Sequence, residues 1–186
     1  VINTFNNEKP YLNKSAIIYN HGFCCSTLLA RLLEESHKII SLKEPPLLNA
    51  LKHFLENNDA IDIKETIFSL HNRTFYNNEK ALWKPSDYAF DLIDETQKLN
   101  IPSILLYSPL REFIASCSKD KRREWIKNRA DYVKICASLN IDLSKIDIKK
   151  TSIQATLYWC SFAKKFIFHS KNSKNLAALN SSTFLN

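Results

Sequence analysis

The segment HGFCCST, residues 21–27, combines the only glycine of the 186-residue chain with two hydroxyl side chains. A short apolar run, residues 16–19, precedes it, and a leucine-rich run with helical spacing, residues 28–33, follows it. A tight turn between a strand and a helix offers backbone N–H groups and the positive end of the helix dipole to an anion. The segment therefore predicts a site for a phosphate-type anion, with an ordinary strand-to-helix turn as the alternative.

Three further segments with chemically useful side chains each follow a predicted strand. Because ligands of open parallel α/β sheets bind at the carboxyl ends of the strands, we expect all four segments to lie at one edge of the sheet. The three are Leu42-Lys43-Glu44-Pro45, Trp83-Lys84-Pro85-Ser86 and Tyr107–Ser116.

These segments resemble parts of one known family. The stretch His21–Arg31 followed by Leu42–Pro45 resembles the 5′-phosphosulfate-binding region of the sulfotransferase superfamily and is most similar to its bacterial sulfotransferase-like group. Tyr107–Ser116 resembles the family's 3′-phosphate-binding segment, and residues 176–185 resemble a late strand and helix. The resemblance implies a P-loop-like sulfotransferase fold and transfer of a sulfonate group from 3′-phosphoadenosine 5′-phosphosulfate to a hydroxyl or amine, without a metal.

The resemblance also implies which residues bind the donor. Arg111 and Ser116 would bind the 3′-phosphate, with the Arg111 guanidinium acting as a bidentate fork. Backbone N–H groups and two hydroxyls of the turn would hold the 5′-phosphosulfate through Gly22, Phe23, Cys24, Cys25, Ser26 and Thr27. Family domains continue beyond the end of this chain, so we expect a C-terminally short domain.

Glu44 and Lys84 are the candidate catalytic residues. Glu44 lies seventeen residues after Thr27, close to where carboxylate-using members of the family place their general base, which accepts the acceptor's proton. Lys84 would stabilise negative charge on the transferring group. The alternatives are a Glu44 that pairs with Lys43 or caps the next helix, and a Lys84 that points into solvent.

Several positions depart from the family pattern. Phe23 replaces the usual loop lysine, Leu28 replaces the aromatic residue that stacks on adenine, and Tyr107 replaces a leading arginine. The histidine that cytosolic members use as base falls near Ser86, which favours Glu44 for that role. These departures keep open a second hypothesis, a degenerate remnant that binds the nucleotide without transfer.

The five cysteines favour reduced thiols in a cytoplasmic protein. Their number is odd, two are adjacent, and no C-x-x-C spacing indicates a zinc site. Cys24 and Cys25 lie where a helix N-terminus lowers a thiol's pKa, so a reactive thiol is an alternative to small apolar packing.

The net charge of +7 and the isoelectric point of about 9.1 are compatible with an anionic nucleotide as partner. The dense basic cluster at residues 119–129 would suit a nucleic acid, but its single aromatic residue, Trp125, does not make the aromatic interleaving typical of strand readers, and the cluster also fits a solvated helix face. A magnesium-dependent P-loop kinase is disfavoured because no lysine follows the glycine turn. No apolar run approaches the roughly 18 residues of a membrane span.

The pattern of apolar runs predicts an α/β fold with a parallel sheet flanked by helices. We expect a single domain over residues 1–186 with a loose N-terminal arm at 1–14. The predicted strands are 16–19, 39–42, 80–84, 103–107 and 175–180. The predicted helices are 26–36, 47–55, 59–75, 86–99, 109–117, 121–139 and 152–169.

Overall fold

The computed structural model describes residues 15–57, 61–76 and 78–185. The chain divides into two compact units. Unit 1 comprises Val1–Leu106 and Ser173–Leu179, and unit 2 comprises Tyr107–Asn172 and Asn180–Asn186. The single-domain prediction stays a prediction, and the predicted N-terminal arm lies outside the described residues.

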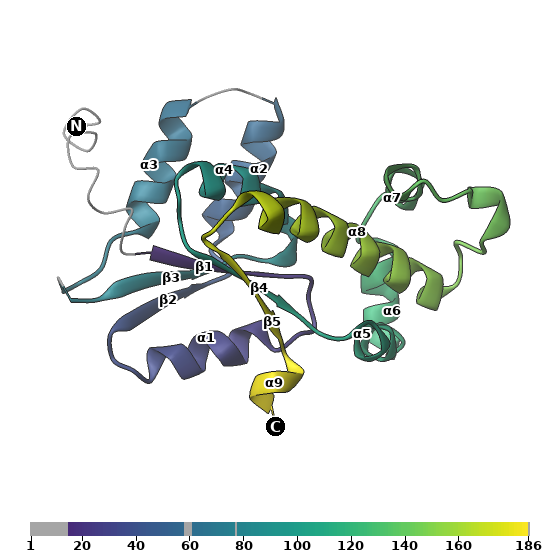
Figure 1. The fold of residues 1–186 in the computed structure, drawn as a ribbon, viewed down its shortest axis with the longest axis horizontal. Helices are drawn as coiled ribbons and strands as arrows, with labels where there is room; N and C mark the ends of the chain where they lie inside the picture. Colours follow the sequence, from purple (N-terminus) through teal and green to yellow (C-terminus); the bar gives the residue numbers. More distant parts are fainter. Residues whose placement is uncertain (1–14, 58–60, 77, 186) are drawn as a thin grey trace. The chain divides into compact units, whose positions relative to one another are not determined.

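A five-stranded parallel sheet is the centre of unit 1, which confirms the predicted α/β class. The strand order is β2-β3-β1-β4-β5 (Figure 1). All five strands lie within one or two residues of their predicted positions: β1 at Ser15–Asn20, β2 at Ile39–Lys43, β3 at Lys80–Lys84, β4 at Ser103–Tyr107 and β5 at Leu176–Asn180.

The parallel register brings the candidate segments of unit 1 to the same end of the sheet. Ile17 of the central strand β1 pairs with Trp83 of β3, and Lys43 of β2 pairs with Lys84. The Trp83 ring stacks on Phe68 with centroids 5.5 Å apart, so β3 is anchored in the core just before its polar end.

Helices cover both faces of the sheet. Helix α1 (Ser26–Glu34) lies along one side, whereas α2 (Pro46–Asn57), α3 (Ile61–His71) and α4 (Ile93–Lys98) lie along the other (Figure 1). The prediction of one helix over residues 86–99 is wrong in its first half. Residues Asp87–Leu92 form the 3₁₀ helix η3, within which Ala89 leaves helical geometry at φ −87° and ψ 15°.

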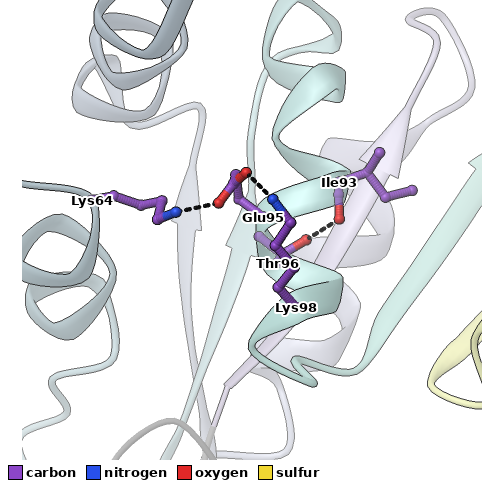
Figure 2. A network of polar contacts seen from close by, with 5 residues as sticks. All are labelled: Lys64, Ile93, Glu95, Thr96 and Lys98. Atoms are coloured by element: carbon purple, nitrogen blue, oxygen red, sulfur yellow. Dashed lines mark hydrogen bonds and ion pairs between the residues drawn. The ribbon is translucent and has the colours of Figure 1, made fainter. Parts of the chain in front are cut away.

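Two of these helices are linked by a polar network around Glu95 (Figure 2). Lys64 of α3 donates to one carboxylate oxygen of Glu95, and Lys98 donates to the other at 2.8 Å. Burial alone would raise the pKa of Glu95, but the hydrogen bonds and charges of the two lysines outweigh it and hold that pKa below its ordinary value. The Thr96 hydroxyl beside it bonds to the Ile93 carbonyl at 3.2 Å and to the Tyr19 hydroxyl at 2.8 Å.

Unit 2 is helical. Helix α8 (Thr151–Asn172) packs against three shorter helices, α5 (Leu110–Cys117), α6 (Asp120–Lys127) and α7 (Tyr132–Leu139). A 3₁₀ turn, η4 (Leu143–Lys145), and a terminal helix, α9 (Ser182–Leu185), complete the described part.

The prediction of one helix over residues 121–139 is wrong, because the chain breaks between α6 and α7. Asp131 caps the N-terminus of α7, and its carboxylate accepts the backbone N–H groups of Val133 and Lys134, each at 3.1 Å. Within the described residues, no helix is both long enough and apolar enough to cross a membrane.

Candidate functional site

Lys84 and Glu44 form an ion pair at the carboxyl ends of β3 and β2. Lys84 is the last residue of β3, and only 2% of its side chain is exposed. A buried ammonium must be paired, and Glu44 supplies the carboxylate. The alternative of a Lys84 that points into solvent is therefore wrong, as is a Glu44 paired with Lys43, because the Lys43 ammonium contacts Glu34 instead.

Glu44 is held at this place by its backbone as well as its side chain. Its N–H donates to the Lys84 carbonyl at 2.6 Å, which extends the β2–β3 pairing by one residue. Its φ of 53° lies in the left-handed region, which costs a non-glycine residue about 1 kcal/mol. The Glu44 side chain remains 56% exposed, so it is open to solvent while its carboxylate contacts the buried ammonium.

The turn after β1 has an unusual backbone. Gly22 has a φ of 85°, Phe23 of 52° and Cys25 of 60°, so three residues in four are left-handed. Only Gly22 adopts such a conformation without a steric cost. The turn delivers the chain to Ser26, the first residue of α1, with Cys25 at the N-cap position and no side-chain cap hydrogen bond.

Asn20, which the sequence analysis did not single out, ties the turn to the end of β3. Its side-chain oxygen accepts the Gly22 N–H at 3.0 Å, and its side-chain nitrogen donates to the Pro85 carbonyl at 3.2 Å. The spacing of Asn20 and Gly22 could have indicated this role, because an Asn side chain often accepts the backbone N–H of the residue two positions later in a turn. Asn20 thereby joins the turn to the segment that carries Lys84.

The Cys24 thiol points into the protein. Its sulfur lies 3.6 Å from the Leu106 carbonyl oxygen, and burial raises its pKa to about 12 even though the N–H groups of Ser26 and His21 and the Lys84 charge favour the thiolate. Cys24 is therefore inert as a nucleophile, which leaves the exposed Cys25 as the thiol at the α1 N-terminus.

The backbone donors of the turn divide into two groups. The N–H of Gly22 is used by Asn20, and the N–H of Ser26 is directed at the Cys24 sulfur. Within the described part of the chain, the N–H groups of Cys24, Cys25 and Thr27 donate to no backbone carbonyl. Backbone donors of this kind at a helix N-terminus suit an anion, and the role of residues 22–27 in binding one stays a prediction.

Arg111 and Ser116 both belong to α5 in unit 2. Arg111 is exposed in the first turn, and its guanidinium contacts no carboxylate among the described residues. Residues five apart on an α-helix point about 140° away from each other around its axis. The two side chains therefore leave α5 in different directions, and their shared role at a 3′-phosphate stays a prediction.

The described residues contain no group of three His, Cys, Asp or Glu side chains that could hold a metal ion. Comparison of the chain with protein-family models, with curated proteins and with solved structures gives no significant match in any of the three.

Proposed function

We propose that the protein transfers a sulfonate group from 3′-phosphoadenosine 5′-phosphosulfate to a hydroxyl or amine acceptor. The observation that supports this proposal best is the juxtaposition of Glu44 with the buried Lys84 at the end of the sheet where the turn leads into α1. A cation, a carboxylate and backbone N–H donors are the groups that sulfonate transfer needs.

In this mechanism the donor's 5′-phosphosulfate accepts hydrogen bonds from the N–H groups of Cys25 and Thr27. It also replaces Glu44 as the counter-ion of the Lys84 ammonium. The released Glu44 carboxylate accepts the proton of the acceptor as the acceptor oxygen or nitrogen attacks sulfur. A new bond from the acceptor to sulfur forms, the bond from sulfur to the bridging oxygen breaks, and adenosine 3′,5′-bisphosphate leaves. Lys84 stabilises the charge that develops on the bridging oxygen.

Arg111 is the proposed partner of the donor's 3′-phosphate. A guanidinium binds phosphate through two parallel hydrogen bonds, and Arg111 is exposed with no carboxylate partner in the described chain. The resemblance also assigns Ser116 to the 3′-phosphate, and that role stays a prediction because Ser116 and Arg111 leave α5 in different directions.

A second candidate is a nucleotide-binding remnant without transferase activity. One observation favours it: the Glu44 carboxylate is bound to the Lys84 ammonium, so it is not free to take up the acceptor's proton. In the remnant, Glu44 serves only as the counter-ion of Lys84 and accepts no proton from an acceptor.

Release of adenosine 3′,5′-bisphosphate from the donor separates the two candidates without knowledge of the acceptor. The wild-type chain is incubated in EDTA with donor and a mixture of simple alcohols, phenols and amines, and Glu44→Gln serves as the test variant. Acceptor-dependent release that Glu44→Gln loses supports the transferase. Binding without release supports the remnant, and absence of both contradicts both.

A further inference from the structure

The basic character of the chain is concentrated in unit 2. By sequence, this unit holds 14 Lys and Arg against 6 Asp and Glu, a net charge of +8, whereas unit 1 holds 12 against 13, a net charge of −1. Five of the six acidic residues of unit 2 form exposed pairs with a basic residue three positions along: Asp120–Arg123, Glu124–Lys127, Asp131–Lys134, Asp142–Lys145 and Asp147–Lys150. These local pairs leave the unit strongly cationic.

One stripe of side chains along α8 is covered by α7 in the N-terminal half of the helix and is exposed in the C-terminal half. In the N-terminal half, Ile153 and Leu157 pack against Tyr132 and Cys136 of α7. Helix α7 ends at Leu139, and the Lys164 ammonium donates to the Ser138 carbonyl there. Beyond this point α7 no longer covers the stripe.

The same stripe continues on the C-terminal half of α8 as Lys164, Ile167, Phe168 and Lys171, which share one helix face by their spacing. None of the residues 163–172 is buried. Ile167 is 52% exposed and Phe168 65% exposed. Two large apolar side chains therefore protrude between two lysines.

We propose that this α8 stripe, residues 164, 167, 168 and 171, docks on an anionic membrane surface. Protruding apolar side chains insert between lipids, while flanking lysines keep their charge at the phosphate level, and the net charge of unit 2 attracts the surface over a longer range. An acidic soluble partner would complement the positive charge. It would also need an apolar groove of its own to accept the two protruding side chains. This inference rests on unit 2 alone and is independent of the proposed sulfonate transfer.

The test is co-sedimentation of the full chain with vesicles of phosphatidylcholine, with and without phosphatidylserine. We expect partition to the anionic vesicles only, weakened by salt. The variant carrying Ile167→Ser and Phe168→Ser should bind at least about tenfold more weakly, and Lys164→Gln and Lys171→Gln about fivefold more weakly each. These side chains are exposed, so the variants should fold, and circular dichroism checks that they do.

The controls remove an exposed aromatic side chain and an exposed lysine from unit 1, as Phe75→Ser and Lys38→Gln. Both should bind like the wild type. The proposal is overturned if the chain ignores anionic vesicles, or if it binds neutral vesicles equally well. It is also overturned if the Ile167→Ser, Phe168→Ser variant matches the Phe75→Ser control, or if RNA is captured while vesicles are not.

Discussion

The ammonium of Lys84 and the carboxylate of Glu44 pair although one side chain is buried and the other is half-exposed. Loss of one partner therefore has a different effect from loss of the other. Loss of the lysine leaves a carboxylate that water can solvate, whereas loss of the carboxylate leaves a buried cation that needs another anion. Lys84 therefore depends on its counter-ion, and a bound anion can replace Glu44 in that role.

Replacement of Glu44 by Gln should therefore separate binding from turnover. Because the competing carboxylate is gone, adenosine 3′,5′-bisphosphate should bind about fivefold more tightly, corresponding to about 1 kcal/mol for a solvent-facing pair. Turnover should fall, since the amide cannot accept the acceptor's proton. Calorimetric titration and product release measure the two effects. Weaker binding by Glu44→Gln would show that the carboxylate does not compete for Lys84.

Asn20 should be important for the shape of the turn. Asn20→Ala removes, from a buried side chain, the acceptor of the Gly22 N–H and the donor to the Pro85 carbonyl. We expect a loss of about 2 kcal/mol in the free energy of unfolding and a Tm about 4–8 °C lower. The control is Asn78→Ala at an exposed position. Equal Tm values for the two variants would refute the role of Asn20.

How much the sequence could predict differs between the sheet and the site. The five strands were predictable because each is a short apolar run bounded by polar or proline residues, and the parallel class followed from the helices between them. The break between α6 and α7 was missed, because helical periodicity continues through it and only the Asp131 cap marks it. The 3₁₀ start at Asp87 was missed for a similar reason, because Ala89 is an ordinary helix former.

The candidate site was predictable in its residue types but not in its contacts. Strand-end positions placed Glu44 and Lys84 at one edge of the sheet. Their pairing requires that β2 and β3 are neighbouring strands of the sheet and that Glu44 has a left-handed φ. Local sequence encodes neither of these features. The inward direction of Cys24 likewise depends on the packing of the whole turn.

Cys25 should be the fastest thiol to react in the folded protein. It is exposed, whereas burial raises the pKa of Cys24 and of Cys117, each to about 12, and Cys136 is buried. A maleimide reagent at neutral pH should label one thiol quickly, and Cys25→Ser should remove that phase. If adenosine 3′,5′-bisphosphate binds the turn, it should slow the labelling. A fast phase that survives in Cys25→Ser would contradict the assignment.

The Glu95 network predicts a pH-dependent contribution to stability. The pKa of Glu95 in the folded chain lies below its ordinary value of 4.5, so the contribution is complete above that value and is lost as the pH falls through the folded-state pKa. At about pH 7, Glu95→Gln should lower the Tm by about 2–4 °C, which corresponds to about 1 kcal/mol. At about pH 3 the difference from wild type should shrink. Glu65→Gln, an exposed control on α3, should change little at either pH, and a pH-independent effect of Glu95→Gln would argue against the ion pairs.

The most direct test of the donor site is the thermal stability of the chain in EDTA with and without adenosine 3′,5′-bisphosphate. The wild type is compared with Lys84→Met, which keeps the volume of the buried side chain, and with the exposed control Lys38→Met. At a hundred times the Kd, the nucleotide should stabilise the wild type and Lys38→Met by about 2.7 kcal/mol, a rise in Tm of about 5–10 °C. Lys84→Met should fold and lose most of that rise. An equal rise in Lys84→Met, or none in the wild type at millimolar nucleotide, would contradict a donor site built around Lys84.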